Sequence, residues 1–173
     1  MRAGEIRLLK WSYIERENGF IHLPAKITKE KKPKTIPINH NIDKLLRIMP
    51  RALHHDYVVT YNGKRINQKD GYKRSFRTAC KEAKIPCGRK TENGILFHDI
   101  RRTVKTNMLS AGVDKAHRDV ILGHSLQGMD AHYLKPTDEA LKQAMEKYTV
   151  WIDNQLEMIL QNVDHLVDQT INK

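Results

Sequence analysis

The sequence predicts an α+β fold that is mainly α-helical and contains a small antiparallel β-sheet. Apolar residues recur at helical spacing in several segments, and most of these segments end near a glycine or a proline. Two short apolar segments, residues 20–23 and 35–38, flank a lysine-rich stretch, as the two strands of a hairpin would. A chain of 173 residues suits one domain with a real core, with at most an appendage added to it.

The first part of the chain is predicted to form a helix followed by a hairpin. Residues 4–11 carry four apolar side chains together with polar ones, which suits a helix. Pro33 and Pro37 restrict the two strands of the hairpin to the edges or ends of a sheet. The lysines between the strands could contact phosphates. Alternatively, they could be edge-strand lysines that prevent aggregation. They are Lys26, Lys29, Lys31, Lys32 and Lys34.

The middle of the chain is predicted to contain a helix, a strand and a second helix. Residues 41–49 form the first helix, with Asn41 as its N-cap and Pro50 as its stop. Residues 57–61 form a strand that ends at an Asn-Gly turn. Residues 69–84 form the second helix, whose outward cations suit either solvent or phosphate. Its inward side chains are Phe76, Cys80 and Ala83, and its outward ones are Lys73, Arg74, Arg77 and Lys81.

A fourth helix is predicted from about residue 97 to Gly112, which stands where a C-terminal cap would. His98 and Arg101 are three residues apart and therefore lie on one face of this helix, about one turn apart. Taken alone, this segment suits an exposed basic helix with a histidine near its start. Arg89 lies in the loop that precedes the helix.

Two further polar side chains follow this helix. Residues 113–122 are predicted to form a helix closed by Gly123, and His124 then stands at the helix exit, where it can reach into a cleft. Tyr133 lies in a short helical stretch that Pro136 stops. A tyrosine in such a place is ordinarily half-buried packing, unless other features of the sequence give it a role.

The tail, residues 150–173, differs in character from the domain proposed for residues 1–149. After residue 150 the only Lys or Arg is Lys173, and apolar residues repeat at alternating steps of four and three, as in a coiled coil. Two interpretations stay open: a helix that packs on its own domain, and a helix that packs on a neighbouring protomer. The apolar residues are Ile152, Leu156, Ile159, Val163 and Leu166.

Composition favours a polyanionic partner. The net charge is +11 and the isoelectric point is about 9.7, which points to nucleic acid. Two cysteines are too few for a disulfide framework, and neither has the spacing to histidines that zinc requires. The sequence shows no long apolar span and no signal peptide, so we expect a cytoplasmic setting and no membrane contact.

Five segments, in order, resemble the tyrosine recombinase or phage integrase family. HDIRRT resembles the family's His-x-x-Arg box and LGHS its second-histidine box, and a tyrosine stands where the nucleophile stands. MRAGEIRLLKW resembles the first-arginine box, and ITKEKKPKTIPI resembles the hairpin that carries the active-site lysine. The resemblance covers residues 1 to about 137. It implies a catalytic set of Arg2, Lys29, His98, Arg101, His124 and Tyr133.

The resemblance implies site-specific recombination or integration of DNA through a tyrosine nucleophile. Tyr133 would attack the scissile phosphate and form a 3′-phosphotyrosyl intermediate, which strand exchange and religation then resolve. Arginines suit this chemistry because guanidinium groups meet phosphate charge with forked hydrogen bonds, and Glu5 is expected to orient Arg2. We expect neither metal nor cofactor, since the phosphotyrosyl ester conserves the bond energy and the sequence has no P-loop.

The expected partner is double-stranded DNA, bound by a homo-oligomer that is a tetramer on DNA. The family implies a bacterial or phage-encoded, nucleoid-associated protein. Helices and a DNA-clamping domain precede the first arginine in this family, so we expect this chain to be truncated and weak in strand exchange. The alternatives are a type IB topoisomerase, a DNA-binding relative inactive in this form, and an RNA-binding module. The expected DNA contacts are Lys26, Lys31, Lys32, Lys34, Lys73, Arg74, Arg77 and Arg89.

Overall fold

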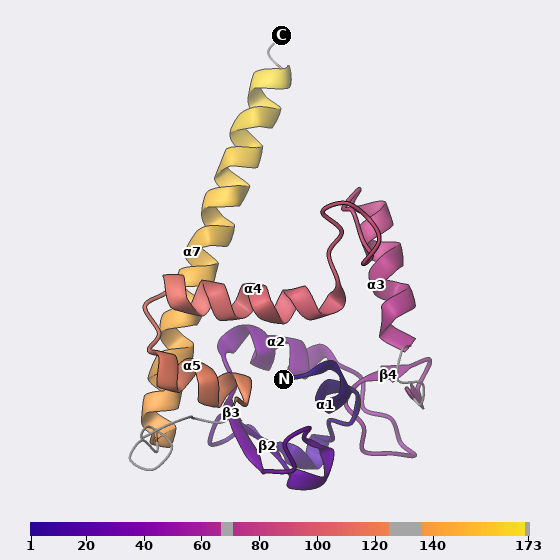
Figure 1. Ribbon diagram of the computed structural model, residues 1–173, viewed down its shortest axis with the longest axis vertical. Coiled ribbons are helices and arrows are strands. Elements are labelled where there is room, and N and C mark those ends of the chain that lie inside the picture. The colour runs from indigo at the N-terminus through magenta and orange to yellow at the C-terminus, as the bar shows by residue number, and fades with distance from the viewer. Residues whose placement is uncertain (67–70, 125–135, 172–173) are drawn as a thin grey trace.

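The structure is a computed structural model that describes residues 1–66, 71–124 and 136–171, with the backbone alone for residues 163–171. It is mainly helical and carries two small antiparallel sheets, as Figure 1 shows. This architecture confirms the α+β fold that the sequence predicts.

The larger sheet has three strands in the order β1 (Ile14–Glu15), β2 (Phe20–Leu23) and β3 (Lys34–Pro37). All neighbouring strands are antiparallel, and Ile21 of β2 pairs with Ile36 of β3. The predicted hairpin is therefore confirmed, and its long connection contains a short 3₁₀ helix, η2 (Ala25–Ile27). The proline at the end of β3 stands at a strand terminus, where a missing amide hydrogen costs no ladder bond.

The smaller sheet is a two-residue hairpin of β4 (Thr60–Tyr61) and β5 (Lys64–Arg65). Asn62 and Gly63 have φ values of 49° and 68°, so the predicted Asn-Gly turn is confirmed, and both of its residues are left-handed. The strand predicted from residue 57 is shorter than expected, because Tyr57 instead makes an isolated bridge to Lys10.

The first helix is also shorter than predicted. Helix α1 runs only over Ala3–Arg7, and a 3₁₀ helix, η1 (Trp11–Tyr13), replaces its expected end. The reason is tertiary, since the backbone of Trp11 donates to the Asp56 carbonyl at 2.9 Å and Val58 donates to the Leu9 carbonyl at 3.0 Å. These long-range bonds take backbone groups that the helix would otherwise use.

Helix α2 (His40–Ile48) is capped by Asn39, so the predicted cap at Asn41 is wrong by two residues. The Asn39 side chain accepts a hydrogen bond from the Ile42 backbone at 2.9 Å, which is the N-cap arrangement. The amide of Asn41 instead donates to Asp153 at 2.9 Å. Both asparagines suit a cap by residue type, and only the backbone geometry distinguishes them.

Three more helices surround the site described below: α3 (Gly71–Glu82), α4 (Phe97–Ser110) and α5 (Lys115–Leu122). Ala83, predicted to face inward, is exposed because α3 ends one residue before it. The core lies where α4, α5, the larger sheet and the first turns of α7 (Asp138–Ile171) meet. Its buried members include Leu9, Ile21, Leu23, Ile36, Leu46, Val58, Met108, Val113, Ile121, Leu122, Leu141 and Met145.

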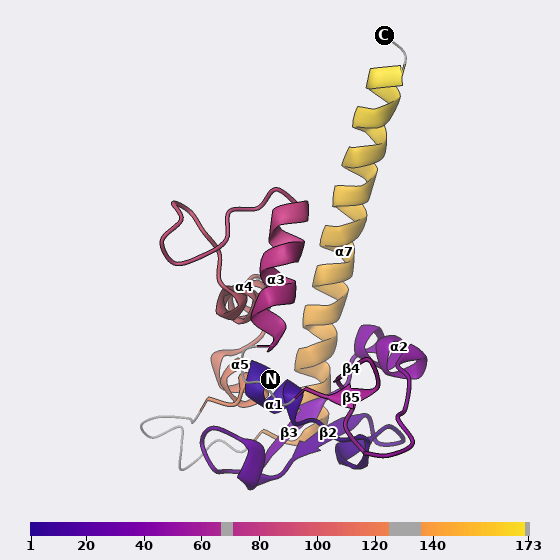
Figure 2. The same cartoon turned by 90° about the vertical axis from the view of Figure 1, so that its right-hand side faces the viewer.

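Helix α7 is continuous from Asp138, whereas the tail helix was predicted from residue 150, so it begins more than three turns earlier than expected. Thr149 is fully buried, and the expected boundary after residue 149 falls within this one helix. Further along, the helix extends beyond the rest of the molecule (Figures 1 and 2), and Leu156 and Ile159 are 51% and 58% exposed. None of the helices, over the residues described, has the length and apolar character needed to cross a membrane.

Candidate active site

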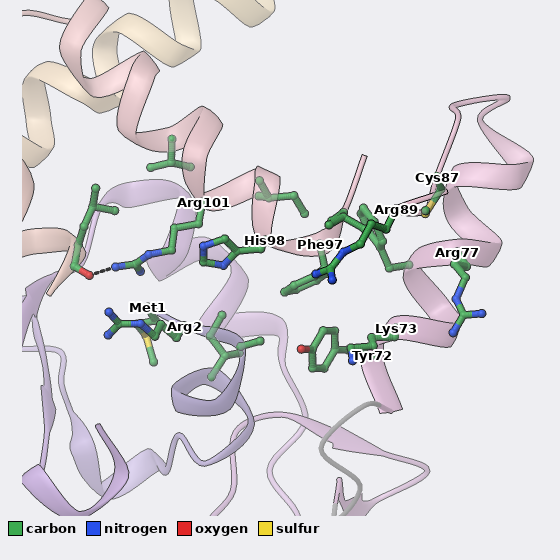
Figure 3. Close-up of a pocket in the computed structure, with 18 residues that line it drawn as sticks. Met1, Arg2, Tyr72, Lys73, Arg77, Cys87, Arg89, Phe97, His98 and Arg101 are labelled. Atoms are coloured by element: carbon green, nitrogen blue, oxygen red, sulfur yellow. Dashed lines mark hydrogen bonds between the residues drawn. The ribbon is translucent and has the colours of Figure 1, made fainter. Parts of the chain in front are cut away.

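A cleft of about 510 Å³ lies between α1, α3 and α4 (Figure 3). Arg2, His98 and Arg101 line it together, although they come from two segments nearly a hundred residues apart. Three of the predicted DNA-binding cations also line it: Lys73, Arg77 and Arg89. The cleft thus joins part of the predicted catalytic set to part of the predicted DNA surface.

Aromatic packing holds the start of α4 at this cleft. The ring of Phe97 lies 4.5 Å from that of Tyr72 and 5.5 Å from that of Phe76, both on α3. The Asp99 carboxylate accepts a hydrogen bond from the Leu96 backbone at 2.8 Å, which satisfies one free amide at the helix start. These contacts fix the first turn of α4, from which His98 projects.

Arg101 occupies the inner end of the cleft. Its Nη2 atom donates to the carbonyl of Leu122, the dashed contact in Figure 3, and lies 3.5 Å from Nε2 of His124. Burial, aided by the charge of Arg2, lowers the pKa of Arg101 below its ordinary value. An arginine stays charged at neutral pH even when its pKa is lowered. The site therefore holds a positive charge on a half-buried side chain. His124 therefore stands beside Arg101 of α4, although it is not among the residues that line the cleft.

Arg2 belongs to a cluster of four charged side chains at the start of α1. Its guanidinium contacts the carboxylate of Glu30, and its backbone amide donates to Glu5 at 2.7 Å. The Lys34 ammonium lies 2.7 Å from both Glu5 and Glu30. Glu5 therefore holds Arg2 through its backbone amide and, at 3.6 Å, through its guanidinium. The closer side-chain partner of Arg2 is Glu30, which the sequence did not single out.

This arrangement corrects the expectation for Lys34. Its side chain is only 8% exposed and is neutralised by two carboxylates, so it is a structural ion-pair residue and not a surface for phosphates. The other lysines of the hairpin are exposed, as a DNA contact requires. Those exposed lysines are Lys26, Lys29, Lys31 and Lys32.

Acid should weaken this cluster. Burial would raise the pKa of Glu30, but hydrogen bonds from Lys34 and Arg2 outweigh it and lower the pKa from 4.5 to about 2. A carboxylate whose pKa is lowered on folding stabilises the protein above pH 4.5, and this stabilisation is lost as the pH falls toward 2. The pKa difference corresponds to at most about 3 kcal/mol. We expect Glu30→Gln to lower the free energy of unfolding at pH 7, with the difference from wild type disappearing near pH 2.

Urea unfolding of the two proteins at several pH values measures this difference. Glu17→Gln, an exposed carboxylate on the turn between β1 and β2, is the matched control and should follow wild type throughout. A difference between wild type and Glu30→Gln that stays constant from pH 7 to pH 2 would contradict the ionised role of Glu30.

Some predicted residues are not gathered at the cleft. Lys29 is exposed on the hairpin, and Arg74 is exposed on α3 outside the lining of the cleft. Tyr133 lies outside the residues that the structure describes. In the described ranges no three His, Cys, Asp or Glu side chains come together as a metal site would need.

Two acidic residues of this site were missed from the sequence, Glu30 and Asp119. Glu30 is adjacent to the lysine that the sequence favoured, and its contact with Arg2 joins segments that the sequence does not connect. Asp119 precedes His124 by five residues across Gly123, and its carboxylate lies 3.3 Å from the imidazole. The glycine cap between them was the available signal, because such a cap turns the chain back on the helix.

Comparison with known proteins agrees with these features. Residues 1–140 match the Phage integrase family. A shufflon-specific DNA recombinase of Escherichia coli is 24% identical over 159 residues, which cover 87% of this chain and 37% of that protein.

Two solved structures share the fold. The integrase from mycobacterium phage Brujita superposes with a TM-score of 0.62 at 17% identity, covering 86% of this chain and 47% of the integrase. The XerA recombinase superposes with a TM-score of 0.57 at 24% identity, covering 85% and 51%. The chain thus spans about a third to a half of the length of these relatives.

Proposed function

Because this chain belongs to the phage integrase family, we propose that it carries the catalytic site of a tyrosine recombinase, which breaks and rejoins double-stranded DNA at specific sites. The observation that carries the proposal is the convergence around Arg101. Arg2 and His98 line the same cleft, and His124 lies 3.5 Å away. Two guanidinium and two imidazole groups in one place suit a phosphodiester whose negative charge grows during attack.

The scissile phosphate would bind between Arg2 and Arg101. Both side chains offer planar forks of N–H donors, which match the non-bridging oxygens of a phosphate. The guanidinium of Arg2 already contacts the carboxylate of Glu30. The phosphate would take the place of this carboxylate, so the free protein holds the arginine charged and ordered until DNA arrives.

The proposed reaction exchanges one phosphate ester for another. The Tyr133 hydroxyl oxygen forms a bond to phosphorus as the bond from phosphorus to the 5′ oxygen breaks. His98 accepts the phenolic proton, and Lys29 donates a proton to the leaving 5′ oxygen. Religation reverses these steps with the 5′ hydroxyl as nucleophile, so the bond energy is conserved and no co-substrate is consumed.

The DNA would lie across the cleft and the exposed lysines of the hairpin. In Figure 2, α3 and α4 lie on one side of α7 and α2 lies on the other. The cations of α3 and of the loop after it lie on the α3 side, and we assign the DNA to that side. Phosphate contacts of this kind position a duplex without reading its sequence.

Binding should therefore weaken steeply with salt. Each phosphate that the protein neutralises adds about 0.9 to the log–log slope of affinity against salt concentration. Reversing the exposed charges of Lys31 and Lys32 to Glu should flatten the slope measured by fluorescence anisotropy on a labelled duplex. Lys44→Glu with Lys147→Glu is the matched control, since both are exposed but lie on α2 and α7. If the two double variants had equal slopes, Lys31 and Lys32 would be exposed lysines that do not contact DNA phosphates.

The protruding part of α7 supports a proposed contact with another protomer. Leu156, Ile159 and Leu160 are 51%, 58% and 62% exposed, which leaves a run of apolar surface on one helix. The buried first turns of the same helix pack on their own domain. Packing on its own domain thus holds for the turns of α7 before residue 150. We propose that the exposed part packs on a neighbouring protomer and that an oligomer on DNA carries out recombination.

Covalent capture tests the proposed function. The protein is incubated with nicked duplexes of randomised sequence, so that a cleaved strand loses the short fragment needed for religation. DNA that stays attached after denaturation with SDS is recovered and sequenced. We expect a 3′-phosphotyrosyl adduct enriched in a particular sequence. Adducts without sequence enrichment, with relaxation of any supercoiled plasmid, would indicate a topoisomerase, and no adduct at any sequence would leave only DNA binding.

A further inference from the structure

Asp119 is a buried carboxylate on α5 that the proposed reaction does not use. Its side chain is 9% exposed. One carboxylate oxygen, Oδ1, lies 3.3 Å from Nδ1 of His124 and 3.5 Å from the ammonium of Lys105 on α4. The other, Oδ2, lies 3.2 Å from the ammonium of Lys115. A buried charge is costly unless it is paired and hydrogen-bonded, and this one is paired on both oxygens.

The C-terminal cap of α5 makes this contact possible. Gly123 has φ of +69°, its amide donates to the Val120 carbonyl at 2.8 Å, and the amide of His124 donates to the Asp119 carbonyl at 2.7 Å. This pair of bonds is a Schellman motif, which turns the chain back over the last helical turn. A Cβ at position 123 would come within 2.5 Å of the Lys34 ammonium. The left-handed backbone therefore favours glycine at position 123, and a Cβ there would have to displace the end of the Lys34 side chain.

The contact determines which nitrogen of His124 carries the proton. An ionised carboxylate only accepts hydrogen bonds, so Nδ1 must be the donor, and in a neutral imidazole Nε2 is then the acceptor. Nε2 faces the Nη2 atom of Arg101 at 3.5 Å, and a guanidinium only donates. Burial would raise the pKa of Asp119, but hydrogen bonds from His124 and Lys115 and the charge of Lys105 outweigh it and hold the pKa below its ordinary value. Asp119 is therefore ionised at neutral pH.

We propose that Asp119 is a positioning residue that holds His124 through its Nδ1–H group and keeps Nε2 directed at Arg101 and at the phosphate bound there. The proposal rests on the proposed function for the identity of that phosphate. On binding, a phosphate oxygen needs a donor, so His124 takes up one proton from solvent at Nε2. Asp119 then faces an imidazolium and stabilises it. The positive charges of Lys105 and Lys115 on the same carboxylate reduce this stabilisation. The role resembles that of the carboxylate that orients the catalytic histidine of serine hydrolases.

A purely structural role for Asp119 would act through Lys105, by tying α5 to α4. The two roles differ in what they require of His124. A positioning role requires the imidazole, so removal of His124 should remove the effect of Asp119. A structural role does not, so its effect would persist without the imidazole.

The first test needs no DNA. ¹⁵N NMR of the histidine rings reports the protonated nitrogen in the full chain, and the His124→Ala variant assigns the signal. We expect His124 to be protonated at Nδ1 in wild type and in Asp114→Asn, and to lose this preference in Asp119→Asn. Asp114 is the matched control because it lies just before the same helix and its side chain is 78% exposed. A neutral ring protonated at Nε2 and not at Nδ1 in the wild-type chain would overturn the proposal without any variant.

The second test is a double-mutant cycle of Asp119→Asn and His124→Ala. It measures cleavage of a duplex whose sequence is recovered in the covalent capture experiment. Asp119→Asn should lower the cleavage rate by about tenfold to a hundredfold, the loss typical when a residue that orients a metal-bound histidine is removed. Asp119→Asn should have no further effect in a His124→Ala background. A loss that persists there would show a structural role and overturn the proposal. If the wild-type chain captures no DNA, the proposed function fails, and the NMR result alone then decides the role of Asp119.

Discussion

Replacing Tyr133 with phenylalanine is expected to abolish the covalent complex with DNA while leaving non-covalent binding almost unchanged. Only the hydroxyl oxygen is removed, and that oxygen is the proposed nucleophile, so no phosphotyrosyl ester can form. The aromatic ring, the basic surface and the site around Arg101 all remain. The measurement is SDS gel electrophoresis of the protein with a nicked duplex, beside fluorescence anisotropy of the same duplex without the nick.

Tyr61→Phe is the control for this experiment. Tyr61 lies on β4, is 72% exposed and has no place in the proposed reaction, so its variant should form the adduct at the wild-type level. An adduct that persists in Tyr133→Phe would mean that another residue attacks the phosphate. Since Tyr133 lies outside the residues described by the structure, this experiment tests an assignment made from the sequence alone.

Replacing Arg101 with lysine should lower the cleavage rate by roughly a hundredfold to a thousandfold, although the charge is kept. Loss of one preorganised donor to a developing oxyanion costs about this much in other enzymes. The Arg101 guanidinium bonds to the Leu122 carbonyl and still reaches Nε2 of His124. A lysine offers one compact ammonium, which cannot span both contacts and a phosphate oxygen at once.

The rate is measured in single turnover at saturating DNA, so that weaker binding does not mask the chemical step. Arg102→Lys is a close control, because Arg102 is the next residue on α4 but its side chain is 78% exposed and paired with Asp99. We expect the control to cleave like wild type. Cleavage by Arg101→Lys at nearly the wild-type rate would contradict the proposal that the Arg101 guanidinium binds the scissile phosphate.

The sequence predicted well those features that depend on neighbouring residues. The hairpin of β2 and β3, the Asn-Gly turn and the glycine caps at Gly112 and Gly123 were all predicted from residue type and short spacing. The proximity of His124 to Arg101 followed from the family resemblance, since no local pattern joins them. The turns and caps, unlike this proximity, share a local cause, because their backbone conformation is decided within a few residues.

Only the tertiary structure decided which charged groups meet. Lys34 was grouped with its neighbours as a DNA contact, yet its ammonium is buried between Glu5 and Glu30, because β3 places it beneath α1. The early end of α1 was likewise set by backbone bonds from a distant segment, and the capping residue of α2, Asn39, donates through its amide to Thr149 of α7 at 3.0 Å.

The sequence by itself determined the kinds of residue available to this protein: a basic chain, an ordered set of arginines, histidines and a tyrosine, and the local elements that carry them. The tertiary structure decided that Glu30 contacts Arg2 and that Asp119 supports His124. Helical and strand periodicities show which faces are apolar, and so which surfaces are buried. They do not show which of several acids a cation will meet, because an ion pair requires only proximity, and distant parts of the chain come close only when the core forms.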